Sequence, residues 1–169
     1  MTEVRDGFEG FDRLWTPHRM AYVAPAQPAG DGCPFCAMED LPPEDSLVVH
    51  RGETCFAVLN LHPYNPGHLM VLPLRHVADL EDLTTEEATE LMAMTQQAVR
   101  VIRRVSGPHA FNIGLNLGGV AGGSLSQHLH QHVVPRWSGD ANFITVLSGT
   151  KTLPQLLSDT RGLLAEAWT

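Results

Sequence analysis

The sequence predicts an α+β domain in which an antiparallel sheet packs against helices. Strand-like stretches follow one another without an intervening helix, which favours antiparallel pairing, and one long amphipathic helix stands apart from them. At 169 residues the chain fits one domain that can bury a core of its own. Residues 1–32 mix glycine, proline and charge, so we expect them to form a flexible N-terminal segment before a domain at residues 33–169.

The expected strands come in two groups. Stretches rich in Val, Leu and Phe predict strands at 46–50, 55–61 and 68–74. Two more are expected at 109–117 and 129–136, joined by the glycine-rich run from Gly118 to Ser124, and a short strand is expected at 143–147.

The helices carry clear boundary signals. Thr84 and Glu87 have capping-box spacing, an apolar stripe follows them, and Gly107-Pro108 ends the pattern, which predicts a helix over 84–106. A terminal helix is expected to start near Thr152. Four leucines of this helix are expected to pack inward: Leu156, Leu157, Leu163 and Leu164.

Composition narrows the function classes. The formal charge of −8 argues against nucleic acid as a partner, since phosphates demand a basic surface. The sequence shows neither an apolar run of about 18 residues nor a charged-then-apolar leader, so we expect no membrane partner and a cytoplasmic location. Three cysteines do not make a disulfide framework in a chain of this size.

Three histidines recur at every second position: His128, His130 and His132. In an extended strand such residues share one face, so all three imidazoles are expected on one side, with Leu129 and Val133 pointing into a core. Single histidines are often satisfied core residues. A row of three behind a glycine-rich run instead indicates chemistry, because imidazole can be nucleophile, general acid or metal ligand at neutral pH.

The stretch HLHQHVVPRW resembles the histidine triad motif of the HIT superfamily. The runs GLNLGGVAGGSLSQHLHQHVVPRWSGDANFI and LNLHPYNPGHLMVLPLRH are most similar to its actinobacterial diadenosine tetraphosphate phosphorylase branch. The resemblance implies a five-stranded antiparallel sheet with helices packed on it, assembled as a homodimer. Residues 33–169 would then be the HIT domain.

By the family's pattern, His130 attacks phosphorus and carries a nucleotidyl intermediate, His132 donates a proton or hydrogen bond, and His128 completes the triad. The implied reaction is phosphorolysis of diadenosine tetraphosphate to ADP and ATP. The implied partners are diadenosine polyphosphates, ATP, ADP, AMP and phosphate, and no organic cofactor is expected.

Substrate contacts are expected around the triad. Gly122, Gly123 and Ser124 let the backbone approach phosphate, although a Gly-Gly pair alone is more often a plain turn. Asn116 would lie beside this loop. By the resemblance Asn60 would meet ribose hydroxyls, although an Asn at a strand end is usually a turn former. The remaining candidate, Trp137, directly follows the motif and is expected to stack on adenine, the alternative being that it caps the core.

Cys33 and Cys36 form a C-x-x-C pair, which supplies only two of the four ligands of a zinc site. The resemblance to zinc-bearing HIT proteins adds His76 and His128. Such a Cys₂His₂ set would be structural, holding the N-terminal segment on the triad strand. The alternative is two reduced cysteines in a turn.

The chain departs from the better-known HIT hydrolases before the triad, where Gly123-Ser124-Leu125 replaces their Gly-Gln-Ser or Gly-Gln-Thr. This difference weakens a plain hydrolase assignment. The alternatives kept open are a hydrolase of dinucleoside polyphosphates or nucleoside phosphoramidates and a nucleotide-binding regulatory module.

Overall fold

A computed structural model describes residues 32–38, 41–42, 46–122, 125–141, 147 and 153–168. Five strands form one sheet in the order β1-β2-β3-β5-β4, and every neighbouring pair is antiparallel. The strands are β1 (Val48–Arg51), β2 (Cys55–Leu59), β3 (Leu69–Pro73), β4 (Ala110–Leu115) and β5 (Gln131–Arg136). The predicted fold class is confirmed.

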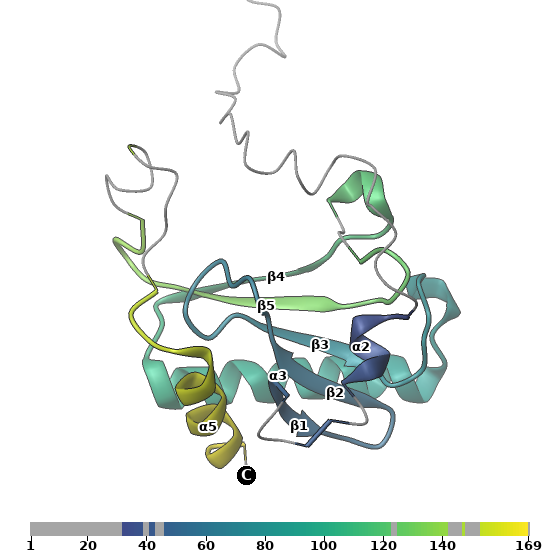
Figure 1. The fold of residues 1–169 in the computed structure, drawn as a ribbon, viewed down its shortest axis with the longest axis horizontal. Helices are drawn as coiled ribbons and strands as arrows, with labels where there is room; N and C mark the ends of the chain where they lie inside the picture. The colour runs from purple at the N-terminus through teal and green to yellow at the C-terminus, as the bar shows by residue number, and fades with distance from the viewer. Residues whose placement is uncertain are drawn as a thin grey trace, which may run out of the picture.

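Helices cover both faces of the sheet (Figure 1). The long helix α3 (Thr85–Ser106) and the terminal helix α5 (Leu157–Glu166) pack on one face, and the short helix α2 (Pro34–Ala37) packs on the other. Two 3₁₀ turns complete the described elements, η2 (Leu80–Asp82) and η3 (Gly119–Ala121). No helix among the described residues is long and apolar enough to cross a membrane.

Strand β2 shows why the sheet is covered on both sides, because all five of its residues are buried. Cys55, Ala57 and Leu59 join the apolar cluster beneath α3 and α5, whereas Phe56 and Val58 join the cluster beneath α2. This alternation is the period-two geometry of a strand. Burying a side chain such as Phe56 stabilises the fold by about 1.5–3 kcal/mol. Each helical layer therefore contributes to stability by covering one apolar face of the sheet.

The boundaries of α3 follow from its caps. The Thr84 side chain accepts a hydrogen bond from the Glu87 N–H, and the Glu87 carboxylate accepts one from the Thr84 N–H. Gly107 ends the helix with φ of 55°, a left-handed conformation that glycine adopts at little cost. The helix predicted over 84–106 is confirmed.

Other boundaries differ from the sequence prediction. Strand β5 begins at Gln131 because the Leu129 N–H donates to the Val77 carbonyl, 2.6 Å away, and not to a neighbouring strand. Helix α5 begins at Leu157, and only Leu164 of the four leucines is fully buried, since Leu156 and Leu163 are exposed. Residues 1–31 and, except for Leu147, the expected strand at 143–147 lie outside the described residues.

Candidate active site

The triad histidines lie along β5 and the segment before it. In the register of β3 with β5, His132 pairs with Met70, whose side chain belongs to the cluster beneath α2. The His130 and His132 rings are 5.0 Å apart, and the Phe35 ring lies about equally far from His128 and His130, at 5.5 and 5.4 Å. The histidines therefore form a row on the α2 side of the sheet, although two of them precede the strand.

A backbone carbonyl determines which ring nitrogen of neutral His130 carries the hydrogen. Its Nδ1 lies 2.8 Å from the His128 carbonyl oxygen, which can only accept a hydrogen bond. The hydrogen therefore sits on Nδ1, and Nε2 keeps its lone pair. An unprotonated Nε2 is the form of imidazole that can attack phosphorus.

His132 has the opposite tautomer. The Tyr64 N–H donates to His68 Nδ1 at 3.1 Å, so the hydrogen of His68 sits on Nε2. That nitrogen is 2.9 Å from His132 Nδ1 and donates to it. His132 is left with its hydrogen on Nε2, which lies 3.4 Å from the Asn116 Nδ2. Because two donors do not pair, the Asn116 amide has to turn its Oδ1 toward His132 to accept this hydrogen. His132 can then act as a proton donor.

Burial keeps this chain of imidazoles neutral. Desolvation, with the nearby His132 and His130 adding to it, lowers the pKa of His68 to about 3. Desolvation also lowers the pKa of His132 to about 4, with a smaller contribution from His130. The Tyr64 ring covers both, with centroids 4.7 Å from His68 and 5.9 Å from His132. At neutral pH the tautomers set by the backbone therefore persist.

His68 is a candidate functional residue that the sequence analysis included only as the first position of the strand expected at 68–74. It directly precedes β3, two residues before the partner of His132, and is fully buried. The available signal was period two, because His68, Met70 and Leu72 alternate as the triad residues do. Without knowing that β3 pairs with β5, this alternation cannot be connected to the triad.

The other residues predicted to contact substrate differ in how near to the triad the structure places them. Asn60 follows β2, and its Oδ1 accepts from the His62 N–H, as a turn former would. Gly122 ends η3 with φ of 95°, a conformation that favours glycine, while Gly123 and Ser124 lie outside the described residues. Among the described members of this set, Asn116 contacts the triad, through His132.

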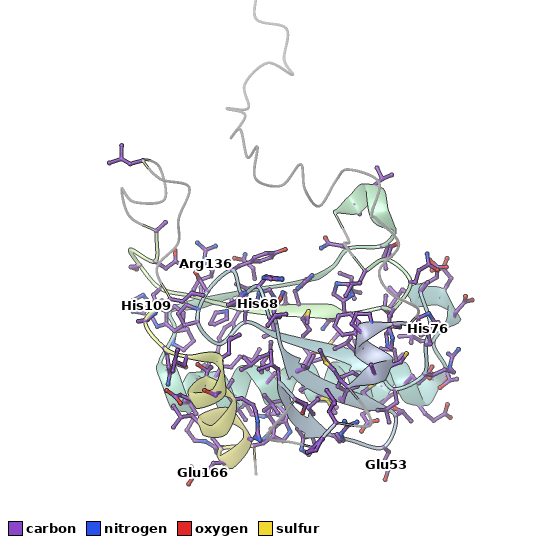
Figure 2. All side chains as sticks on the ribbon, in the orientation of Figure 1. Glu53, His68, His76, His109, Arg136 and Glu166 are labelled. Carbon is purple, nitrogen blue, oxygen red and sulfur yellow. The ribbon has the colours of Figure 1, made fainter. Side chains whose placement is uncertain are left out.

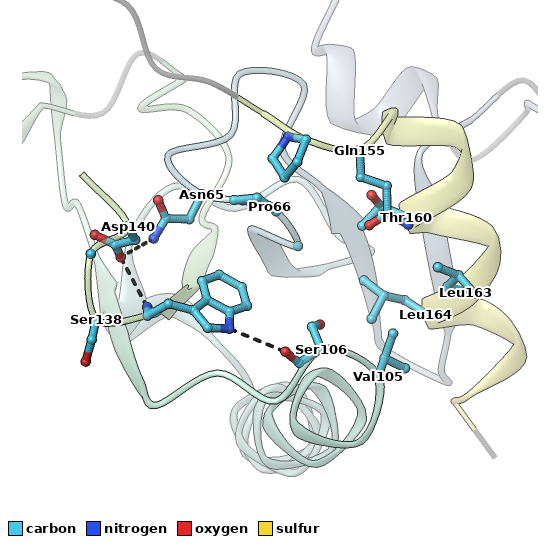
Figure 3. Close-up of a pocket in the computed structure, with 14 residues that line it drawn as sticks. Asn65, Pro66, Val105, Ser106, Ser138, Asp140, Gln155, Thr160, Leu163 and Leu164 are labelled. Carbon is cyan, nitrogen blue, oxygen red and sulfur yellow. Dashed lines mark hydrogen bonds between the residues drawn. The ribbon is translucent and has the colours of Figure 1, made fainter. Parts of the chain in front are cut away.

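Trp137 lies on the opposite face of the sheet. Its indole N–H donates to the Ser106 carbonyl at 3.3 Å, at the end of α3. It lines a cavity of about 470 Å³ with Val105 and Leu164, and none of the triad histidines is among the residues that line it (Figure 3). Residues 132, 134 and 136 alternate to the triad side, so residue 137 points the other way. The structure therefore does not bring Trp137 of this chain to the triad.

The four predicted metal ligands do come together. One ligand atom each from Cys33, Cys36, His76 and His128 lies within 4.8 Å of the others. Sγ of Cys33 is 3.4 Å from His128 Nδ1, and Sγ of Cys36 is 3.3 Å from His76 Nδ1 and 3.6 Å from His128 Nδ1. Tetrahedral zinc with bonds of about 2.3 Å to sulfur and 2.0 Å to nitrogen would separate a sulfur from a nitrogen ligand by about 3.5 Å. The geometry fits a metal ion.

His128 is prepared for this role. Its Nε2 lies 2.9 Å from the Pro73 carbonyl and donates to it, which leaves the Nδ1 lone pair directed at the thiols. Both ring nitrogens are thereby engaged, so His128 contributes to the triad through its backbone carbonyl. Two histidines outside the cluster have other partners, since His50 stacks on Trp168 and His109 contacts Ser138.

Comparison with known proteins identifies the family of this chain. The family model described as HIT domain matches residues 42–139. The chain belongs to the HIT family. An AP-4-A phosphorylase from Mycobacterium tuberculosis is 60% identical over 163 residues, which are 92% of this chain and 84% of that protein.

Two further HIT relatives bear on the site. An asymmetrical bis(5'-nucleosyl)-tetraphosphatase from Schizosaccharomyces pombe is 39% identical over 98 residues, 58% of this chain and 53% of that protein. The crystal structure of a zinc-bound histidine triad family protein from Mycobacterium smegmatis has a TM-score of 0.65 and 30% identity, covering 80% of this chain and 92% of that one. This HIT chain thus resembles both nucleotide-cleaving and zinc-bound proteins.

Proposed function

We propose that this HIT-domain protein cleaves diadenosine tetraphosphate with phosphate as acceptor and releases ADP and ATP. The observation that carries the proposal is the pair of Nδ1 contacts, from His130 to the His128 carbonyl and from His132 to His68 Nε2. These contacts assign a free Nε2 lone pair to neutral His130 and an Nε2 hydrogen to the neighbouring His132. Such a pair supplies a nucleophile and a proton donor to one phosphorus centre. The phosphorylase from M. tuberculosis supports the choice of substrate.

The reaction would proceed in two displacements. His130 Nε2 forms a bond to the α-phosphorus while the bond from that phosphorus to the bridging oxygen breaks, and ATP leaves with a proton or hydrogen bond from His132 Nε2. A phosphate oxygen then attacks the nucleotidyl-His130, the nitrogen–phosphorus bond breaks, and ADP forms. His132 recovers its proton from the attacking phosphate.

The neighbouring residues would hold the nucleotide. We assign the phosphate cradle to Gly122, Gly123 and Ser124, the ribose contact to Asn60, and a phosphate contact to Asn116. Backbone N–H groups and amides suit these roles on an acidic protein, because they meet the substrate's charge locally.

We further propose that Cys33, Cys36, His76 and His128 bind one structural zinc ion. Zinc would lock α2 and the segment after β3 onto the triad strand. Elemental analysis of protein purified without chelator should find about one zinc per chain. The Cys36→Ser variant should lose the zinc, whereas Cys55→Ala, which changes the buried cysteine outside the cluster, should keep it. A metal-free wild-type protein would contradict the assignment.

The deciding experiment is incubation with diadenosine tetraphosphate with and without phosphate. Phosphorolysis predicts a rate that rises steeply with phosphate and yields ADP plus ATP. The second candidate, hydrolysis, is supported by the tetraphosphatase relative and predicts equal rates without phosphate, with AMP among the products. Binding without turnover would leave the regulatory module as the function.

Assembly and location stay predictions. A homodimer is supported by β4, an edge strand whose Ile113 side chain is 48% exposed, and light scattering during gel filtration tests it. A cytoplasmic location is supported by the use of Cys33 and Cys36 as thiolates, which need a reducing compartment.

A further inference from the structure

A second hollow lies on the triad side of the sheet, above β4 and β5. Its volume is about 420 Å³. His132, Asn116 and Tyr64 border it, Gly114 lies in its floor, and Asn112 and Arg136 also line it. Figure 2 places His76, in the metal cluster, and Arg136 toward opposite ends of the sheet, with His68 between them. None of the roles assigned so far uses the part of this hollow beyond Asn116.

The hollow exists because residue 114 has no side chain. Gly114 sits inside β4 directly opposite His132 in the register with β5. Its φ is not positive, and a Cβ added there would meet no atom within 4 Å, so neither backbone conformation nor crowding requires glycine. Glycine inside a strand costs about 0.5–1 kcal/mol relative to alanine and often marks the close approach of a ligand.

The proton on His132 faces this hollow. His132 Nε2 points toward Asn116, and both residues belong to the lining. In the displacement proposed above, the group that needs this proton is the oxygen of the departing polyphosphate. The departing chain must therefore lie beside His132 Nε2, on the β4 side.

The far part of the hollow suits further phosphates. Arg136 is the cation of the lining, and at about 3.3 Å per residue it lies about 13 Å along β5 from His132. Its guanidinium is held by Asp140 through Nε and Nη2 and by the Asn112 Oδ1 through Nη1. These bonds use three of the five N–H donors that arginine carries, so two can meet a ligand. A fixed guanidinium is a good phosphate partner.

We propose that this hollow is the subsite for the polyphosphate leaving group and then for the incoming inorganic phosphate. The proposal rests on the function proposed above and adds where the two phosphate-bearing groups bind. In each in-line displacement the attacking group enters opposite the group that leaves. In the second displacement the acceptor displaces His130, so it attacks the side of phosphorus from which ATP departed in the first. The acceptor phosphate therefore takes the place beside His132 that the departing ATP has vacated.

Gly114→Val tests the subsite by filling its floor. Valine favours a strand, so the variant should fold at least as well as the wild type. In calorimetry, inorganic tripolyphosphate should bind the variant at least about tenfold more weakly, while the affinity for AMP, which needs only the nucleotide side, should stay within about twofold. The kcat/KM for diadenosine tetraphosphate should fall by about tenfold or more. Gly162→Val, on α5 across the sheet, is the matched control and should change none of these values.

Two results would overturn the proposal: tripolyphosphate that does not bind the wild type or binds both proteins equally, or AMP affinity that falls in parallel with tripolyphosphate affinity. The second result would mean that the valine disturbs the catalytic centre itself. Calorimetry needs no turnover, so it judges the subsite separately from the phosphorolysis assay.

Discussion

His68→Gln should make the protein less sensitive to acid. Burial holds the pKa of His68 at about 3, whereas an unfolded histidine titrates at about 6.5. Because the folded value is the lower one, the unfolded chain binds more protons between these two values. The stability that depends on the neutral imidazole is present above pH 6.5 and is lost as the pH falls toward 3.

The size of the effect follows from the gap between the two pKa values. A pH of 5 lies about 1.5 units below the pKa of histidine in the unfolded chain. At about 1.4 kcal/mol per unit, protonation of the unfolded chain then lowers the free energy of unfolding by about 2 kcal/mol. Glutamine can still donate to His132 Nδ1 and accept from the Tyr64 N–H, yet it does not titrate. Between pH 7 and pH 5 the wild type should therefore lose about 2 kcal/mol more than the variant.

Urea unfolding at pH 7, 6 and 5, followed by circular dichroism, measures both proteins under the same metal conditions. Acid release of metal affects them equally, so it cancels in the difference. Parallel stability curves for wild type and variant would refute the claim that His68 is neutral and tautomerically fixed. Following the His68 ring protons by NMR provides an independent check.

Three further outcomes are expected. His130→Asn should reduce turnover by several orders of magnitude while nucleotide affinity stays nearly intact, because only the covalent path is lost. A variant that retains more than about a tenth of the activity would show that His130 is not the nucleophile. His132→Ala should cost about 10²–10⁴-fold in kcat, and less with a substrate whose leaving group needs no proton, as steady-state kinetics can show. Thr84→Ala should lower the free energy of unfolding by about 1 kcal/mol in urea, with kcat unchanged, because it removes the α3 cap.

The sequence predicts the fold well where local signals are strong. The capping residues at Thr84 and Gly107 fix α3 to within one residue, and the apolar runs give all five strands. The start of β5 was predicted two residues early, because the Leu129 N–H pairs with the carbonyl of Val77, a tertiary contact that periodicity does not reveal.

The site shows the same division. The sequence itself shows the repeat of three histidines and the C-x-x-C pair. The family resemblance added His76 and His128 as the other two expected metal ligands. The tautomers depend on carbonyl and N–H groups from His128 and Tyr64, which no residue pattern encodes. The face on which Trp137 lies, by contrast, follows from strand parity, since one step beyond Arg136 moves a side chain from the triad face of the sheet to the other. The sequence therefore contained the signal against a contact between Trp137 and the triad of the same chain.

His128 belongs both to the four-residue cluster and to the contact that orients His130. Its imidazole lies in the cluster, while its carbonyl oxygen lies 2.8 Å from His130 Nδ1. If the cluster binds metal as proposed, loss of the metal or oxidation of a thiol would loosen His128 and with it the ring of His130. Chelation should then slow adenylyl transfer more than it weakens nucleotide binding.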